Sequence, residues 1–269
     1  MGGVAIRRHR QGTRGVIDEY GKGGGFGAAV AVMSRGPITA TEKARADRVI
    51  RRVLRRHHIE SPASVRLARS GSFGATTIAQ VNTRFRGTAI RVQAEGPGGF
   101  ALTFAAERLD RQLDRLTGRA EPRWAPDPGR AALAFVSDDR VIVRRKHCRL
   151  NVFDPVGATA AMDRMDFDAH LFTDAETGED AVVYWAGPLG VRMARQRQMR
   201  PPVTATLRPL TMNPRPTRDF TESEAITRLC AHGLPFLFFT DPSDRRGRLL
   251  YRRYDGDLGL VAGTDVSIE

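Results

Sequence analysis

The sequence predicts an α+β protein, with a β-α-β-β-β-α domain followed by two small α+β repeats. Short segments alternate apolar and polar residues, two longer segments have helical apolar spacing, and one motif recurs 67 residues further on. At 269 residues the chain can hold more than one domain. We divide it into a tail (1–26), a first domain (27–120), a linker (121–139) and two repeats (140–200 and 201–269).

The first domain is expected to begin with a strand and an amphipathic helix. Residues 1–26 are basic, rich in glycine and without periodicity, which predicts a disordered tail. The apolar run 28–34 is typical of a strand. Thr39 and Glu42 then have the spacing of a capping box, so a helix should begin there and extend to about His57.

Three further strands and a second helix should complete this domain. Residues 64–69, 76–86 and 88–95 alternate apolar and polar side chains, and Arg86-Gly87 fits a tight turn. Residues 104–116 then place Leu and Ala on one face of a helix. The order predicts a four-stranded sheet with both helices on one face.

The second half contains an internal repeat. Residues 170–174 (His-Leu-Phe-Thr-Asp) recur as residues 237–241 (Leu-Phe-Phe-Thr-Asp), and each copy is expected to form a helix and three strands. Copies of roughly 60 residues are too small for comfortable lone stability, so we expect them to pack on each other. The residues predicted at this contact are Phe172, Val182, Tyr184, Phe238, Phe239, Leu249 and Tyr251.

The net charge of +13 resides entirely in the first 120 residues, which hold 22 basic and 9 acidic residues; the remainder holds 21 of each. Both predicted helices carry arginines on the side opposite their apolar face, which favours binding to a polyanion over an ordinary solvated surface. Phe104 lies within the arginine face of the second helix. Its ring could stack on a base, or it could be an ordinary exposed aromatic side chain. The candidate phosphate-binding residues are Arg45, Arg48, Arg52, Arg55, Arg84, Arg86, Arg91, Arg108, Arg111, Arg115 and Arg119.

Other site chemistries receive little support. Asp174, Glu176 and Asp180 alternate as in a calcium loop, but the ligand set is incomplete and a hairpin turn fits better. The His147-Cys148 and Cys230-x-His232 pairs lack zinc-site spacing, so no metal is expected. No nucleophile elbow or phosphate loop occurs, so we expect neither an enzyme nor a cofactor, and no small-molecule substrate.

Two cysteines imply no disulfide framework, which favours a cytoplasmic protein. No apolar run reaches the roughly 18 residues that a membrane-spanning helix needs, so no membrane partner is expected.

Three stretches resemble the long ribosome hibernation-promoting factors. Residues 108–115 are similar to the last helix of the family's ribosome-binding domain, and residues 141–146 to the strand that opens its C-terminal domain. Residues 172–184 closely resemble the hairpin of that domain. Arg108, Arg111 and Arg115 match the family's rRNA-facing positions residue for residue, whereas the arginines of the first helix match only as a pattern.

This resemblance implies a stress- or dormancy-related translation inhibitor that binds 16S rRNA in the mRNA and tRNA channel of the 30S subunit. The chain departs from the usual long form because it has two C-terminal copies, as the dormancy- or hypoxia-associated factors of actinobacteria do. His170 replaces an aromatic residue of the motif, and Pro214 and Pro216 suggest that the second copy lacks its opening strand. We expect the copies to pair within one chain, as a pseudo-dimer, and to leave single 70S ribosomes.

Two other functions fit the same residues. A general RNA-binding or transcription-modulating protein would use the arginines on other RNA. A structural interaction protein would act through residues 121–269 and lose its activity without them.

Overall fold

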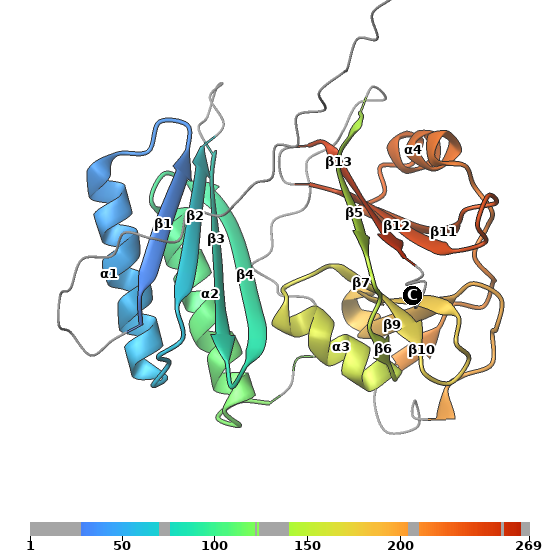
Figure 1. The fold of residues 1–269 in the computed structure, drawn as a ribbon, viewed down its shortest axis with the longest axis horizontal. Helices are drawn as coiled ribbons and strands as arrows, with labels where there is room; N and C mark the ends of the chain where they lie inside the picture. Colours follow the sequence, from blue (N-terminus) through green and yellow to red (C-terminus); the bar gives the residue numbers. More distant parts are fainter. Residues whose placement is uncertain are drawn as a thin grey trace, which may run out of the picture.

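The computed structural model describes residues 28–69, 76–121, 123, 140–203, 210–253 and 256–264. Within these ranges it forms a first domain with one four-stranded sheet and a second unit with two further sheets (Figure 1). The predicted tail (1–26) and nearly all of the predicted linker (121–139) lie outside the described residues. None of the described helices is both long and apolar enough to cross a membrane.

The first domain has the predicted β-α-β-β-β-α order. Its elements are β1 (Val30–Arg35), α1 (Ala40–Arg56), β2 (Ala63–Arg69), β3 (Thr76–Phe85), β4 (Thr88–Pro97) and α2 (Phe100–Leu116). The strands lie in the order β1-β2-β3-β4. β1 and β2 are parallel because α1 crosses between them, and the other neighbours are antiparallel. β1 and β4 are therefore the edge strands of this sheet.

Both helices of the first domain cover one face of its sheet. Ile50 of α1 and Leu109 and Leu113 of α2 are fully buried in one cluster with Val81 of β3 and Val92 of β4. Apolar residues at helical spacing thus meet alternate residues of the strands, as the patterns predicted. The predicted fold class is confirmed.

The predicted capping box sets the beginning of α1. The Thr39 hydroxyl accepts a hydrogen bond from the Glu42 N–H at 3.2 Å, and the Glu42 carboxylate accepts from the Thr39 N–H at 2.7 Å. That backbone bond, followed by a hydrogen bond from Arg69, holds the pKa of Glu42 below its usual value. The first turn is therefore anchored both to its own cap and to β2.

The second unit contains two sheets and two principal helices. Its elements are β5 (Ile142–Cys148), β6 (Val152–Phe153), α3 (Pro155–Arg164), β7 (Ala169–Asp174), β8 (Asp180–Trp185), the 3₁₀ turn η1 (Gly187–Leu189), β9 (Val191–Arg195), β10 (Leu210–Met212), α4 (Glu222–Ala231), β11 (Phe236–Thr240), β12 (Gly247–Arg252) and β13 (Leu258–Gly263). One sheet has the order β10-β9-β8-β7-β6 and the other β11-β12-β13-β5.

The two repeats exchange one strand each. β5 lies at the beginning of the first repeat, yet it pairs in parallel with β13 at the edge of the second repeat's sheet. β10 precedes the second repeat's helix, yet it pairs in parallel with β9 of the first repeat. The division into 140–200 and 201–269 remains a prediction about domains, but the hydrogen-bonded sheets cross it in both directions.

This exchange corrects two expectations. The segment 141–146 opens the sheet of the other copy, and the second copy's sheet does have a strand at the edge where none was expected. Pro214 and Pro216 lie beyond β10, so they do not interrupt its pairing with β9. The local pattern identified a strand correctly but carried no information about its partner.

The second unit is layered as helix, sheet, sheet, helix (Figure 1). α3 covers the outer face of the first repeat's sheet, and α4 covers the outer face of the second repeat's sheet. The inner faces share a cluster that contains Leu171 and Val182 from one repeat and Phe238 and Leu249 from the other. Face-to-face burial of apolar residues therefore joins the two repeats.

Of the seven residues predicted at this contact, four lie there: Val182, Tyr184, Phe238 and Leu249. Phe172 and Phe239 lie instead in the separate cores beneath α3 and α4, because alternate residues of a strand point to opposite faces. Tyr251 lies outside the shared cluster, with the Lys146 ammonium 5.9 Å from its ring centroid.

Candidate nucleic-acid interface

The arginine row of α1 (Arg45, Arg48, Arg52 and Arg55) is exposed along the length of the helix. The row results from the three- and four-residue spacing, which places these side chains opposite the buried Ala46, Ile50 and Leu54. Within the described part of the chain, Arg48, Arg52 and Arg55 form no ion pair; Arg45 donates to the Thr103 hydroxyl at 3.2 Å. This row presents guanidinium groups that an external anion can reach.

The acidic side of α2 faces α1. The Asp110 carboxylate lies 2.8 Å from Arg56 Nη1 and, through its other oxygen, 2.8 Å from His57 Nε2. Asp114 lies further along the same side, 4.0 Å from His57 Nδ1. These three residues, His57, Asp110 and Asp114, are close enough to share a metal ion, but both oxygens of Asp110 already have protein partners. The cluster is an ion-pair network that joins the helices.

Arg108 was predicted to be exposed, and this prediction is wrong. The side chain is buried at the junction with the first repeat, where Nη1 donates to the Gln93 carbonyl at 2.7 Å and lies 3.2 Å from the Asp166 carboxylate. Arg115, one helical turn further on, donates from Nε and Nη2 to the Asp163 carboxylate at 3.1 and 3.2 Å. Half of the predicted face of α2 therefore binds acids of the same chain.

The partner of this face is the end of α3 together with the residues that follow it, 163–167, which we call the docking loop. Its Asp166 carboxylate accepts from the Gln93 N–H at 2.9 Å, and its Asp163 carbonyl accepts from the Gln112 side chain at 2.7 Å. Gln93 belongs to β4, which has a neighbouring strand on one side only. The docking loop therefore satisfies backbone groups on the open edge of β4. Figure 1 shows α3 beside α2 and β4.

Arg91 and Arg123 extend the same contact. Arg91 donates to the Met165 carbonyl at 3.3 Å, and its guanidinium carbon lies 5.3 Å from the centroid of the Phe167 ring. Arg123, in the predicted linker, pairs with Asp163 at 2.9 Å and lies over the Trp185 ring at 4.4 Å. Both residues help to hold the first repeat against the first domain.

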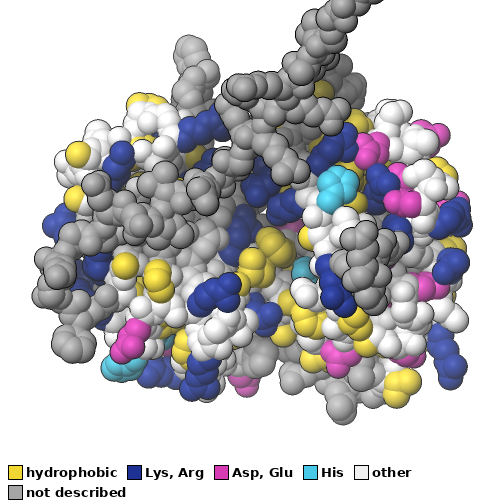
Figure 2. Space-filling model, in the orientation of Figure 1, with side chains coloured by type: hydrophobic (Ala, Val, Ile, Leu, Met, Phe, Trp, Pro, Cys, Tyr) yellow, Lys and Arg dark blue, Asp and Glu magenta, His cyan; other side chains and the backbone are white. Residues whose placement is uncertain are grey.

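The remaining candidates are exposed. Arg84 and Arg86 flank the β3–β4 turn, where Arg86 and Gly87 have the positive φ angles of the predicted tight turn. Figure 2 shows Lys and Arg side chains on both halves of this face, including several along the boundary between the halves. The predicted residues that are exposed are Arg45, Arg48, Arg52, Arg55, Arg84, Arg86, Arg111 and Arg119.

Phe104 is also exposed, and its ring centroid lies 6.2 Å from that of Phe100. The two rings form a small apolar surface at the beginning of α2. A flat, exposed aromatic surface beside arginines can accept a stacked base.

Sequence reasoning missed the acids of the docking loop. The internal repeat contains the signal that could have found them, because Asp166 is equivalent to Gly233 in the second copy. Both residues have a positive φ, 50° and 59°, immediately after the cap of their helix. Glycine is favoured there, so an aspartate at this position indicates a role for its side chain.

The acids considered for calcium have arginine partners instead. Asp174 lies 2.8 Å from Arg195 Nε, and both side chains are fully buried. Asp180 lies at the contact between the repeats, where its carboxylate accepts from Arg246 Nε and from the Gly247 N–H, each at 2.8 Å. These carboxylates stabilise the fold of the second unit.

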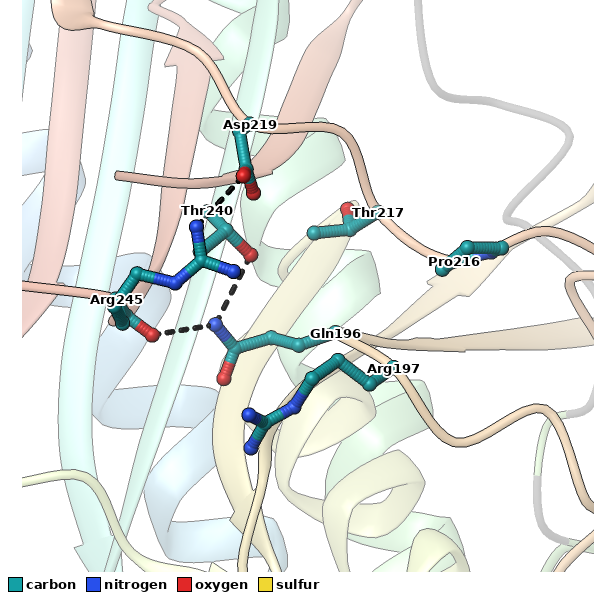
Figure 3. A pocket seen from close by; sticks show the side chains of 7 residues that line it. All are labelled: Gln196, Arg197, Pro216, Thr217, Asp219, Thr240 and Arg245. Carbon is teal, nitrogen blue, oxygen red and sulfur yellow. Dashed lines mark hydrogen bonds and ion pairs between the residues drawn. The ribbon is translucent and has the colours of Figure 1, made fainter. Parts of the chain in front are cut away.

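A small cavity of about 110 Å³ lies at the same contact (Figure 3). The Gln196 side chain donates to the Thr240 hydroxyl and to the Arg245 carbonyl, and Arg245 pairs with Asp219 at 2.7 Å. The polar groups that line the cavity thus bind one another, and they do not converge on an empty centre.

Comparisons with known proteins agree with the sequence resemblance. Residues 137–190 match the family model for the Sigma 54 modulation/S30EA ribosomal protein C terminus. The chain is 45% identical over 242 residues to the dormancy associated translation inhibitor of Mycobacterium tuberculosis, in both strains CDC 1551 and H37Rv. This match covers 87% of the chain and 88% of the relative.

Two solved structures resemble a third of the molecule. The N-terminal domain of Thermus thermophilus Protein Y matches 33% of this chain and 98% of its own, with 22% identity and a TM-score of 0.29. A ribosomal subunit interface protein from Coxiella burnetii matches 34% of this chain and 98% of its own, with 15% identity and a TM-score of 0.26.

Proposed function

The chain belongs to the ribosome hibernation-promoting factors, the family of the Mycobacterium tuberculosis dormancy associated translation inhibitor, and we propose that it inhibits translation by binding the small ribosomal subunit. In this proposal the first domain occupies the mRNA and tRNA channel at the decoding region and contacts 16S rRNA. Occupancy alone blocks translation, and the idle ribosome is kept as a single 70S particle.

The arginine row of α1 is the observation that carries this proposal. Its exposed guanidinium groups lie on a rigid helix whose opposite side is anchored in the core of the domain. Arginine forks match phosphate oxygens, and contacts to phosphates position a protein without reading a sequence. Specificity for a ribosome would then come from the fit of the domain to the shape of the channel.

Charge reversal on the row tests the proposal. The double variant Arg48→Glu/Arg52→Glu should bind ribosomes at least about tenfold more weakly in co-sedimentation. The binding that remains should depend less steeply on salt concentration, because fewer phosphates are neutralised. The matched control is Arg215→Glu/Arg218→Glu, which makes the same change in charge on exposed residues of the second repeat. Equal loss in both variants, or in neither, would contradict the assigned surface.

Competition separates this function from general RNA binding. A hibernation factor should remain bound to ribosomes in the presence of excess bulk RNA, because the channel offers shape as well as phosphates. If bulk RNA removes the protein from ribosomes in proportion to its phosphate concentration, general RNA binding is the better description.

We further propose that the two repeats pair within one chain and that the factor therefore does not join two ribosomes. The charges at the contact support this. Asp180 and Glu179 of the first repeat are equivalent to Gly247 and Arg246 of the second. Within one chain Asp180 meets Arg246 and Gly247, whereas two first repeats would bring acids together.

Sedimentation tests this second proposal. The free protein should sediment as a monomer, and ribosomes saturated with it should remain in the 70S peak. A new peak of paired ribosomes, or a stable dimer of the free protein, would contradict it.

A further inference from the structure

The docking loop and the predicted RNA-binding face of α2 are closely fitted to each other. Arg108, Gln112, Gln93 and Asp166 are all less than 10% exposed, although they come from two separately folded parts of the chain. Their polar groups are matched: Asp166 accepts from the Gln93 N–H, and Arg108 donates to the Gln93 carbonyl and approaches Asp166. Charged groups are buried at such a contact only when partners compensate for the loss of water.

The second repeat serves as an internal reference for this loop. α3 and α4 have equivalent caps, and the backbone hydrogen bonds that close the helix end are equivalent in the two copies. The second copy has Cys230 and Gly233 where the first has Asp163 and Asp166. The helix end therefore forms without either carboxylate, and Asp166 even occupies a backbone conformation that favours glycine.

Both carboxylates bind residues of the first domain, and Asp163 also binds Arg123 of the predicted linker. Asp163 binds Arg115 and Arg123, and Asp166 binds the edge of β4 and Arg108. An RNA phosphate presents the same kind of acceptor, oxygens with a negative charge, to the same guanidinium groups. A phosphate and the docking loop cannot both occupy Arg108 and Arg115.

We propose that the docking loop is an internal competitor of RNA: it covers the arginine face of α2 in the free protein, and binding to rRNA through that face displaces it. This inference rests on the proposed function, because it assigns the α2 face to rRNA. The α1 row is open in the free protein, so it makes the first contact with phosphates. Arg108 and Arg115 become available only after the first repeat moves away from β4 and α2.

Such competition lowers the affinity of the free protein. When only a fraction of the molecules is open, the apparent dissociation constant rises by the inverse of that fraction. Weakening the docking loop should therefore strengthen binding, which is the opposite of what loss of a structural contact normally does.

The test uses the full chain with Asp163→Asn and Asp166→Gly together. Glycine keeps the helix end, as Gly233 does in the second copy, and removes the carboxylate. Two measurements report on the loop without ribosomes: hydrogen exchange at the Gln93 amide and affinity for polyuridylate. Exchange should speed up at least about tenfold, and polyuridylate and 70S ribosomes should both bind about tenfold more tightly.

The control is Asp219→Asn with Asp244→Asn, which removes two negative charges from exposed residues of the second repeat. It should leave the Gln93 exchange unchanged and improve binding by no more than about twofold, through net charge alone. In the unaltered protein, added polyuridylate should itself speed the Gln93 exchange.

The outcomes separate the two proposals. Unchanged or weaker binding by the docking-loop variant, with ribosomes still bound normally, overturns the competition and leaves the proposed function standing. Faster exchange and tighter polyuridylate binding without any ribosome binding by either protein supports the competition for phosphate and overturns the ribosomal function. Affinity gains equal to those of the control also overturn the competition.

Discussion

Replacement of Asp180 by alanine should destabilise the second unit, because this carboxylate joins the two repeats. Asp180 is 3% exposed and accepts from the Gly247 N–H at 2.8 Å and from Arg246 Nε and Nη2 at 2.8 and 3.2 Å. Its loss leaves the buried Gly247 N–H without an acceptor, which costs about 1–3 kcal/mol. Arg246 can turn toward water, so its ion pair adds at most about 1 kcal/mol.

The expected loss of unfolding free energy is therefore about 1–4 kcal/mol for Asp180→Ala. Urea unfolding monitored by far-UV circular dichroism and tryptophan fluorescence measures it. Asp219→Ala is the control, because Asp219 and its partner Arg245 are both exposed and form a surface pair; it should cost less than about 1 kcal/mol. Equal losses in the two variants would refute the role given to the buried N–H.

Two further predictions concern single residues. Burial lowers the pKa of His170 from 6.5 to about 4, with Arg164 adding to the effect, so the unfolded chain takes up a proton at a higher pH than the folded one. Stability should therefore fall as the pH drops from about 6.5 toward 4, by up to about 3 kcal/mol, and His170→Phe should remove this dependence in unfolding curves measured at several pH values. A Cβ added at Gly247 would lie 2.6 Å from the Asp180 Cβ and 2.9 Å from the Phe238 ring. Gly247→Ala should therefore lower the free energy of unfolding by about 1–3 kcal/mol through overpacking. An unchanged midpoint of urea unfolding would show that the strands at this contact move apart easily.

The order of elements and the faces of the helices could be predicted from the sequence. The capping box at Thr39 and Glu42, the turn at Arg86 and the buried residues of α1 all follow from local spacing, because each depends on neighbours within four residues. The exposure of the α1 row follows too, because its side chains lie opposite the buried residues of the helix.

The contact between the polar face of α2 and the docking loop could not be predicted in the same way. Arg108 and Arg111 have the same place in the pattern of α2, yet one is buried and the other is exposed. The difference depends on Asp163 and Asp166, which are about 50 residues away in the chain. Hydrophobic periodicity identifies the side that faces the core, but it does not reveal whether the polar side meets solvent or another part of the molecule.

The pairing partners of the strands could not be predicted from local sequence patterns either. The predicted contact between the repeats includes Phe172 and Phe239, both of which belong to the repeated motif. Their position in the alternation places them under α3 and α4 instead. The exchange of β5 and β10 leaves no trace in the composition of either strand.

Exchange of β5 also sets a condition on biosynthesis. Ile142 pairs with Leu258, so the first strand of the second unit emerges from the translating ribosome well before its partner has been made. β5 therefore stays unpaired while both helices and nearly all the other strands of the second unit are synthesised. A nascent chain that is arrested or truncated before β13 cannot complete this sheet, and cutting the gene between the repeats would give two fragments that each lack a strand of their own sheet.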